Sequence, residues 1–100
     1  MTVPFEQGDI LSLEKIKRPV LVVSKNFFNQ SEQAVVCPIL PNSAGDPLHI
    51  EITTEELCGF VLCEQLKLVD LRYRGYKLLS RIKYADVMNI TDAIQSIFDY

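Results

Sequence analysis

The residues with the clearest chemical potential lie in one stretch of the chain, Gly59–Lys77, which reads GFVLCEQLKLVDLRYRGYK. Its second half carries basic side chains at Arg72, Arg74 and Lys77, with the aromatic ring of Tyr73 between the two arginines. Basic side chains bind phosphates and aromatic rings stack on unpaired bases, so this composition suits a single strand of RNA. A solvated strand face ending in a hairpin tip has the same composition, and this segment alone leaves both interpretations open.

The distribution of charge along the chain favours a nucleic-acid ligand more than the net charge does. The whole chain carries a net charge of −3, which by itself disfavours a nucleic-acid binder. Between residues 64 and 84, however, six basic residues stand against two acidic ones, so this segment carries +4 and the remainder −7. A local positive field on an acidic body favours a short single-stranded substrate over indiscriminate binding to duplexes.

Metal-free cleavage of RNA is a reaction that such a segment could serve. In this reaction the ribose 2′-hydroxyl attacks its own phosphate. It needs a base for the hydroxyl, a cation against the charge that develops on the phosphate, and an acid for the leaving oxygen. Arginine suits the second role because its planar guanidinium pairs with two phosphate oxygens.

The elements that must position these residues are mainly β-strands. Apolar alternation and runs of β-branched residues predict strands, and clusters of turn-forming residues separate them. The expected strands are Gly8–Leu13, Pro19–Ser24, Ala34–Leu40, Leu48–Ile52, Gly59–Cys63, Leu66–Leu71 and Lys77–Ile82. The expected connections are a polar loop at Lys25–Gln33, the loop at residues 41–47 and a short polar turn at Thr53–Leu57.

Several side chains receive specific expectations within this pattern. Pro38 predicts an edge strand or a bulge, because proline cannot donate a hydrogen bond within a sheet. Leu66, Leu68 and Leu71 alternate with polar neighbours and are expected on the buried face of their strand. His49 alternates with inward-facing isoleucines, so we expect it to be a solvent-facing strand residue without a catalytic role.

The last segment predicts an amphipathic helix that covers the open end of the sheet or contributes to a subunit contact. Asp86 is expected at its first turn or as its N-terminal cap. Apolar residues recur at spacings of three and four, namely Val87, Ile90, Ala93, Ile94, Ile97 and Phe98. Together these elements predict a single domain over residues 1–100. Its fold class is mainly β: a small SH3-like barrel of five to seven mostly antiparallel strands with a C-terminal helix.

Cysteine and histidine usage indicates a reducing compartment and no bound metal. Cys37 and Cys63 lie within apolar runs and are expected to be buried free thiols, with Cys58 as the third cysteine. The only histidine, His49, has no neighbouring ligands of the kind that zinc requires. No apolar run approaches the roughly 20 residues that a membrane span needs. We therefore expect a cytoplasmic protein without a metal or other cofactor and without membrane association.

Four blocks of the sequence resemble the MazF/PemK/Kid toxins of bacterial toxin–antitoxin pairs. The Gly59–Lys77 segment is similar to the third quarter of these toxins. Upstream, Gly8–Ile10 and Arg18–Ser24 resemble the opening of the family, and Val35–Ile39 resembles its next strand, all in the family order. The resemblance implies an SH3-like barrel that acts as an mRNA interferase: it cleaves single-stranded mRNA without a metal and so inhibits growth.

The resemblance also implies roles for individual residues and partners. It implies Arg18 as a catalytic arginine, and Glu64 as a catalytic acid whose use as a base would need a pKa raised toward neutral. The RNA-binding residues would be Arg72, Arg74, Lys77, Tyr73, Gln65 and Ser43. The implied assembly is a symmetric homodimer with a cognate antitoxin of the PemI/MazE kind. Operator DNA would be bound only through the antitoxin complex.

This sequence departs from the family pattern at two expected catalytic positions. The usual threonine is replaced by Leu40 or Pro41, and the arginine of Kid-like members by Leu62, and neither leucine nor proline offers a side-chain donor. Ser43 could replace the threonine only if its loop folds back. An alternative function therefore stays open, in which the barrel has lost cleavage and binds RNA or a protein target such as gyrase, as CcdB-like poisons do.

Overall fold

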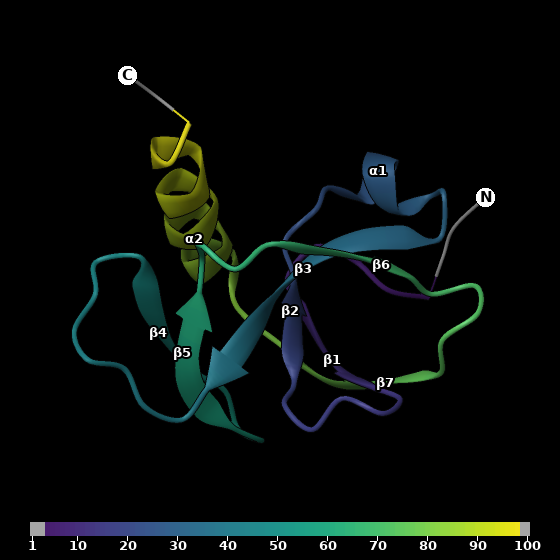
Figure 1. The fold of residues 1–100 in the computed structure, drawn as a ribbon, viewed down its shortest axis with the longest axis horizontal. Helices are drawn as coiled ribbons and strands as arrows, with labels where there is room; N and C mark the ends of the chain where they lie inside the picture. Colours follow the sequence, from purple (N-terminus) through teal and green to yellow (C-terminus); the bar gives the residue numbers. More distant parts are fainter. Residues whose placement is uncertain (1–3, 99–100) are drawn as a thin grey trace.

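The computed structural model describes residues 4–98, which form a strongly curled antiparallel sheet with one long helix packed against it (Figure 1). The elements are β1 (Asp9–Leu13), β2 (Val20–Val22), α1 (Asn26–Asn29), β3 (Gln33–Leu40), β4 (His49–Thr53), β5 (Cys58–Leu62), β6 (Lys67–Asp70), β7 (Tyr76–Arg81) and α2 (Tyr84–Ser96). The strand order is β4-β5-β3-β2-β1-β7, with β6 paired to β3, and every pair is antiparallel. The predicted fold class is confirmed: seven strands form a partly open barrel, followed by a C-terminal helix.

Strand β3 is the centre of the sheet because it is hydrogen-bonded along both of its edges. One edge pairs with β2, and the other pairs first with β6, over Gln33–Val36, and then with β5, over Ile39–Leu40. This exchange of partners divides the sheet into a β4–β5 wing and a larger curled part, seen to the left and right of β3 in Figure 1. The sheet therefore curls around β3.

Pro38 marks the point at which β3 exchanges its partners. The amide of Ile39 donates to the carbonyl of Pro19 on the β2 side, at 3.0 Å. Successive amides of a strand point to opposite edges, so the position without an N–H at Pro38 faces the gap between β6 and β5. The prediction of an edge strand is wrong, because β3 is central. The proline is accommodated because no partner carbonyl stands at that point.

Apolar side chains are buried on both faces of the central strands, which explains their continuous apolar runs. One cluster lies between the sheet and α2, and it is formed by Ile10, Leu21, Val23, Cys37, Ile39, Ile52, Val61, Cys63, Ile82 and Ile90. The second cluster fills the curled part of the sheet, and it is formed by Phe5, Leu11, Leu13, Val20, Val22, Ala34, Val36, Val69 and Leu71. Along β3, even-numbered residues enter the second cluster and odd-numbered residues the first.

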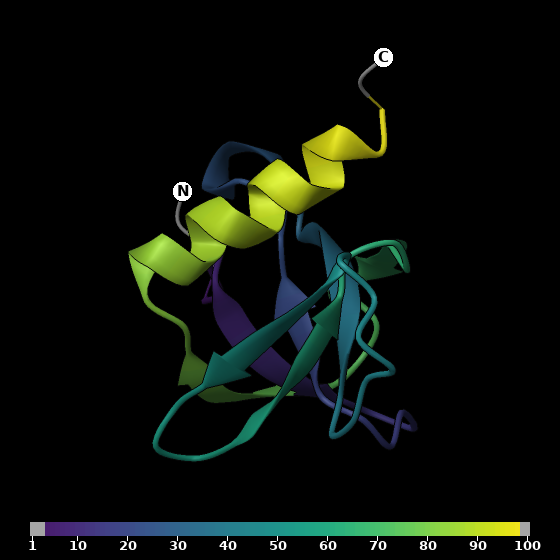
Figure 2. The same cartoon turned by 90° about the vertical axis from the view of Figure 1, so that its left-hand side faces the viewer.

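Helix α2 lies across one face of the sheet, as Figure 2 shows from the side. Val87, Ala93 and Ile94 pack around the fully buried Ile90 against the first cluster, so the predicted covering helix is confirmed. Asp86 lies in the first turn, as expected, but no side chain caps the helix. The predicted apolar stripe was too long: Phe98 is 70% exposed, because the helix ends at Ser96.

Two local predictions are wrong. Leu66 and Leu68 are exposed, whereas Val69 and Leu71 are buried, because pairing with β3 turns the odd-numbered side of β6 toward the core. The predicted polar loop at Lys25–Gln33 contains the short helix α1. The buried Asn29 stabilises that helix, because its side-chain amide donates to the backbone carbonyl of Ser24 at 3.0 Å. In both cases a tertiary contact overrides the local pattern.

Membrane insertion through a helix finds no support in the described part of the chain. Among residues 4–98, no helix combines the length and the apolar character that crossing a bilayer requires.

We predict that Gly59→Ala destabilises the fold by about 1–3 kcal/mol through overpacking. A Cβ atom at Gly59 would lie 2.8 Å from the carbonyl oxygen of Leu40 and 2.9 Å from Cγ2 of Ile39, where β5 meets β3. Urea unfolding measures the change. Gly75→Ala is the matched control, because its Cβ would meet only the flexible carboxylate of Glu14, at 3.3 Å. Equal stability of the two variants would contradict close packing at the junction of β3 and β5.

Candidate active site

The most distinctive polar group of the structure is a chain of three side chains from separate loops and strands. Ser43 Oγ lies 2.7 Å from Nδ1 of His49, and Nε2 of His49 lies 3.0 Å from Oε2 of Glu64. Ser43 belongs to the connection between β3 and β4, His49 begins β4, and Glu64 belongs to the turn after β5. We call these three residues the serine–histidine–glutamate chain.

Strand pairing explains why these residues meet. His49 is the register partner of Leu62 in the β4–β5 ladder, and the amide of Cys63 donates to the carbonyl of Leu48 at 3.0 Å. The turn that begins after Cys63 therefore passes beside the first residue of β4. Glu64 is the first side chain of that turn that can reach the imidazole.

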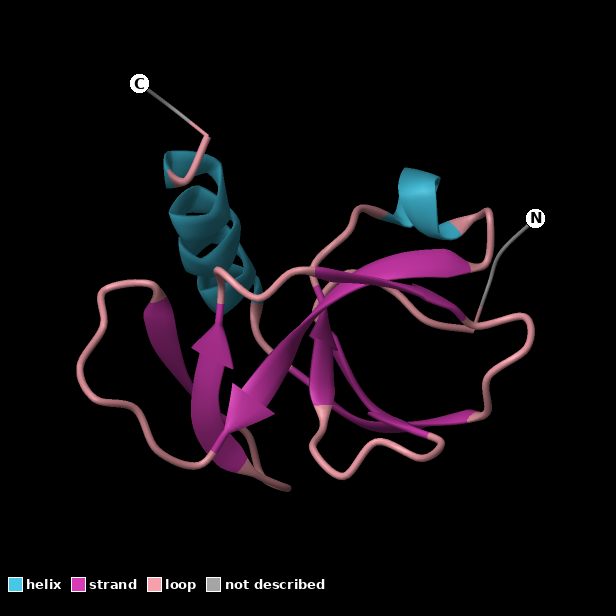
Figure 3. Cartoon of the chain, in the orientation of Figure 1, coloured by secondary structure: helices cyan, strands magenta, loops and turns pink. Residues whose placement is uncertain are grey.

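The connection between β3 and β4 folds back onto β4, and it brings Ser43 to His49. The amide of Gly45 donates to Ser43 Oγ at 3.2 Å, and Gly45 has a φ of +90°, which favours glycine. The amide of Leu48 donates to Oδ1 of Asp46 at 2.8 Å. Figure 3 shows this connection as the long loop beside β4. These turns direct the hydroxyl of Ser43 toward the imidazole.

His49 is not the solvent-facing residue that the alternation predicted. Its side chain is 16% exposed, and both ring nitrogens have hydrogen-bond partners. We place the imidazole proton on Nε2, because Glu64, whose pKa is lowered, can only accept a hydrogen bond when ionised. Nδ1 then accepts the hydroxyl proton of Ser43. The sequence carried no signal for this arrangement, because it depends on the pairing of β4 with β5.

The electrostatics of Glu64 favour a role as a hydrogen-bond acceptor. Burial raises the pKa of Glu64, but the hydrogen bond and the charge of His49 outweigh burial, and the net result is a lowered pKa. The condition for Glu64 as a base, a pKa raised toward neutral, is therefore not met. Burial and neighbouring negative charges raise the pKa of Cys63 to about 11 and that of Cys37 to about 12, so both are neutral free thiols, as predicted.

Arg18 is not part of the serine–histidine–glutamate chain. It lies in the exposed connection between β1 and β2. Within residues 4–98 its guanidinium makes no hydrogen bond or ion pair. The next residue, Pro19, accepts the amide of Ile39, so Arg18 is placed beside the end of β3, near Leu40. The structure therefore leaves the Arg18 side chain available to a ligand.

A shallow groove of about 340 Å³ extends between the Arg18 segment and the turn that carries Glu64. Ile16 and Val20 line it from the side of Arg18, and Gln65 and Lys67 line it from the side of Glu64, with Val36, Pro38 and Leu66 between them. Gln65 is thus placed at the groove, as its expected role in RNA binding requires. An extended strand that follows the groove would run from the segment of Arg18 to the turn of Glu64.

The basic residues of the expected RNA surface form a separate group at the β6–β7 connection. Arg72 is held by Asp70 through two bonds, of 3.1 and 2.8 Å, and lies 5.2 Å from the ring centre of Tyr73. The Arg72 hydrogen bond lowers the pKa of Asp70 to about 2. Arg74 donates to the carbonyl of Glu14 at 3.3 Å, which joins this group to the β1–β2 connection. Lys77 is exposed, and Tyr73 is 82% exposed.

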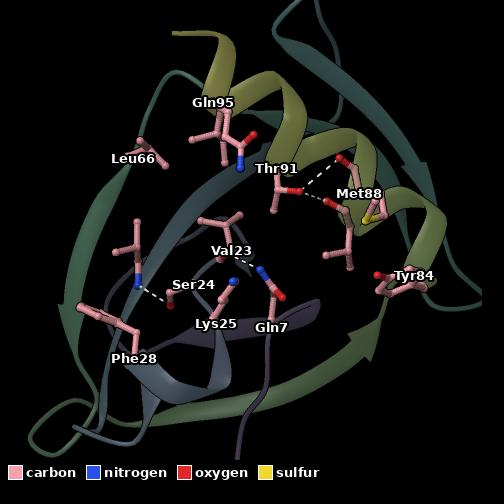
Figure 4. A pocket seen from close by; sticks show the side chains of 13 residues that line it. Gln7, Val23, Ser24, Lys25, Phe28, Leu66, Tyr84, Met88, Thr91 and Gln95 are labelled. Carbon is pink, nitrogen blue, oxygen red and sulfur yellow. Dashed lines mark hydrogen bonds between the residues drawn. The ribbon is translucent and has the colours of Figure 1, made fainter. Parts of the chain in front are cut away.

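A second hollow, of about 460 Å³, lies between α2 and the β2–β3 side of the sheet (Figure 4). Its walls are mostly apolar, with Phe28 on the side of α1 and Met88 on the helix α2, and Lys25 is among the polar lining residues. Such a surface offers van der Waals contact and no acid–base pair, so the chemistry is assigned to the groove near Glu64. Within the described residues, no group of three or more His, Cys, Asp or Glu side chains could hold a metal ion.

A small curled antiparallel barrel with a C-terminal helix is the fold of the MazF toxins. The structure is similar to MazF in the MazE–MazF complex of Deinococcus radiodurans, with a TM-score of 0.85, 21% identity and coverage of 94% of this chain and 95% of that one. It is also similar to a mycobacterial endoribonuclease crystallised with its cognate antitoxin (TM-score 0.82, 17% identity, 94% of each chain covered). A third similar structure is the toxin MazF-mt6 of Mycobacterium tuberculosis (TM-score 0.74, 15% identity, 93% and 99% covered).

The sequence itself places the chain in a family. Residues 2–98 match the family described as PemK-like, MazF-like toxin of type II toxin–antitoxin system, and the chain belongs to that family. A search of curated protein sequences found no match. The resemblance inferred from the four sequence blocks is thus confirmed.

We predict that restoring the Kid-like arginine by Leu62→Arg destabilises the protein by about 3–5 kcal/mol, because it buries an unpaired charge. Leu62 is 3% exposed and lies at the end of β5. Leu62→Met, which keeps the volume, should cost less than about 1.5 kcal/mol. Urea unfolding of both variants provides the measurement. A fully stable Leu62→Arg protein would mean that the end of β5 opens to solvent.

Proposed function

We propose that this MazF-like toxin inhibits growth by cleaving single-stranded mRNA without a metal ion. The observation that carries the proposal is the serine–histidine–glutamate chain. Gln65, the residue after Glu64, lines a groove that Ile16 and Val20 line from the β1–β2 connection, which also carries the exposed Arg18. Such a groove offers a titratable imidazole, an ionised carboxylate and a cation to one phosphodiester. These are the group types that attack by the 2′-hydroxyl requires.

Each residue of the site receives a role in this proposal. Arg18 stabilises the negative charge on the phosphate, and Glu64 acts through its hydrogen bond with His49. Gln65, which lines the groove, and Ser43, which is hydrogen-bonded to His49, would contact the sugar or base of the cleaved nucleotide. Flanking nucleotides reach the β6–β7 connection, where Arg74 and Lys77 bind phosphates, Tyr73 stacks on a base, and Arg72 orients the tyrosine.

The proposed partners follow from family membership and from the exposed surface. A cognate antitoxin of the MazE or PemI kind would bind the basic β6–β7 connection through an acidic, disordered segment and so compete with RNA. Operator DNA would be bound only through that complex, in the cytoplasm. A symmetric homodimer would cover exposed leucines of the edge strand β7, Leu78 at 50% and Leu79 at 36% exposure. A single species of monomer mass in sedimentation at tens of micromolar would refute the dimer.

The experiment that tests the proposed function is cleavage of a labelled single-stranded RNA in the presence of a chelator. We expect products that end in a cyclic phosphate. Arg18→Ala should lower the single-turnover rate by about 10²–10³-fold, as for removal of one preorganised charge contact. The fold should be retained, because Arg18 is exposed. Lys17→Ala, which removes the neighbouring exposed cation, is the control for a general change in charge.

Intact RNA together with growth inhibition would refute cleavage and favour a protein target, such as gyrase. Wild-type cleavage by a folded Arg18→Ala protein would refute the role of Arg18 while leaving the nuclease function in place.

A separate prediction concerns the RNA surface at the β6–β7 connection. Neutralising Arg74 or Lys77 with glutamine should weaken binding of a noncleavable single-stranded oligonucleotide. The slope of log affinity against log salt should decrease by about 0.7 for each lost phosphate contact. Arg72→Gln should change the slope less, because Asp70 already neutralises this guanidinium. Equal slopes for all three variants and the wild type would remove this surface from the RNA path.

A further inference from the structure

We propose that His49 is the general base of the cleavage reaction, with Glu64 as the residue that positions it and stabilises its protonated form. This inference rests on the proposed function, RNA cleavage at the groove beside Glu64. His49, which the sequence pattern predicted to face solvent, takes up the proton. The role of Glu64 changes from base to positioning residue.

The geometry of the serine–histidine–glutamate chain supports this assignment. A general base needs a lone pair within hydrogen-bond reach of the proton that it removes, and a partner that fixes its orientation. In the assigned tautomer, Glu64 accepts a hydrogen bond from Nε2–H at 3.0 Å, and the lone pair of the ring lies on Nδ1. Nδ1 already accepts a hydrogen bond from the hydroxyl group of Ser43 at 2.7 Å. The site therefore presents an imidazole nitrogen to a hydroxyl donor, which is the interaction that removal of a 2′-proton requires.

The groups nearest to the imidazole are carboxylates and hydroxyl or thiol groups. Glu64 faces Nε2, and the carboxylate of Asp46 lies close enough to raise the pKa of Glu64 by its charge. The thiols of Cys63 and Cys37, which burial and nearby negative charges keep neutral, lie behind Glu64. Among the described residues, no lysine or arginine is hydrogen-bonded to the imidazole. Negative charge therefore lies on the Nε2 side of the imidazole and a hydroxyl lies on its Nδ1 side.

The proposed step balances as follows. The RNA 2′-hydroxyl takes the position of the Ser43 hydroxyl as donor to Nδ1, and its proton passes to that nitrogen. The 2′-oxygen forms a bond to phosphorus, and the bond between phosphorus and the 5′-oxygen breaks with its electron pair on the 5′-oxygen. That oxygen takes up a proton from water, and the imidazolium returns its proton to solvent. The products are a 2′,3′-cyclic phosphate and a free 5′-hydroxyl, and Arg18 compensates the charge on the phosphate throughout.

A purely structural role is the competing explanation, because the same hydrogen bonds join the loop at residues 41–47 to β4 and to the turn after β5. Such a role affects folding and RNA affinity but adds no titrating group to the reaction. The dependence of the rate on pH therefore separates the two explanations. His49 is the only histidine of the chain, so one imidazole NMR signal reports its titration without ambiguity.

The experiment measures single-turnover cleavage of a labelled RNA between pH 4.5 and 9 (roughly the range in which histidine titrates), in chelator, with the full-length protein. For the wild type we expect a rate that rises with pH and levels off at the pKa measured by NMR for the sole imidazole. His49→Gln keeps an amide that can donate to Glu64 but has no base. We expect it to fold, to bind RNA, to cleave about 10²–10⁴-fold more slowly, and to lose the rise with pH.

Glu64→Gln is the second variant, and it keeps the test valid if His49→Gln does not fold. Removing the carboxylate should lower the imidazole pKa, so the NMR titration and the rise in rate should both move to lower pH, with a lower plateau. Glu51→Gln is the matched control. Glu51 is an exposed carboxylate on β4, two residues after His49, and it is not part of the serine–histidine–glutamate chain. It should leave both curves unchanged.

The outcomes distinguish this inference from the function on which it rests. RNA that stays intact with the wild-type protein at every pH would refute the nuclease function itself. Cleavage by the wild type together with an unchanged rate and pH profile for His49→Gln would refute only the role of His49. A shift of the NMR titration in Glu64→Gln without a shift in the rate profile would also refute it, since the titrating base would then be another group.

Discussion

Hydrogen bonding along both edges of β3 is the constraint on which the rest of this structure depends. One edge is continuous with β2, while the other exchanges β6 for β5 across Pro38. That exchange lets one sheet form both the curled part and the β4–β5 wing, and it buries apolar side chains on both faces of the central strands. A proline is tolerated there because its missing donor faces the gap between two partners.

An ion pair between the buried carboxylate of Asp9 and the half-exposed guanidinium of Arg81 joins two strands of the curled part. Asp9 is fully buried; its Oδ1 accepts from Nε of Arg81 at 2.6 Å and its Oδ2 accepts from the amide of Glu6 at 2.8 Å. Arg81 also pairs with the carboxylate of Glu6 at 2.8 Å. These contacts join β1, β7 and the segment before β1, so both oxygens of a costly buried carboxylate are satisfied. The sheet edge opposite the groove is thereby held in place.

The candidate site is a consequence of the same sheet. The exchange at Pro38 brings β5 beside β3, the β4–β5 register brings His49 beside the turn after β5, and the folded-back loop adds Ser43. Relative to the family pattern, the positions of the threonine and the second arginine hold residues without side-chain donors. The serine–histidine–glutamate chain is built from the loop after β3, the start of β4 and the turn after β5. A barrel can therefore keep its groove while the side chains that line it change.

Local pattern determined much of this protein from its sequence. The seven strands and the final helix follow from apolar periodicity, and the buried thiols from apolar neighbours, because both depend on residues close in the chain. Exceptions such as Leu66 and Leu68 occur where the two faces of a short strand are similarly apolar, so that only pairing with β3 selects the buried side.

Only the tertiary structure decided which polar residues meet. Ser43 and Glu64 stand six and fifteen positions from His49, and no periodic pattern relates them; a hydrogen-bonded register and two turns bring them together. The same holds for Arg72, whose charge the sequence assigned to RNA but whose guanidinium is already paired with Asp70. Residue types and strands could be predicted because they depend on local physics. The site could not, because the partners of a side chain are set by strand pairing between distant segments.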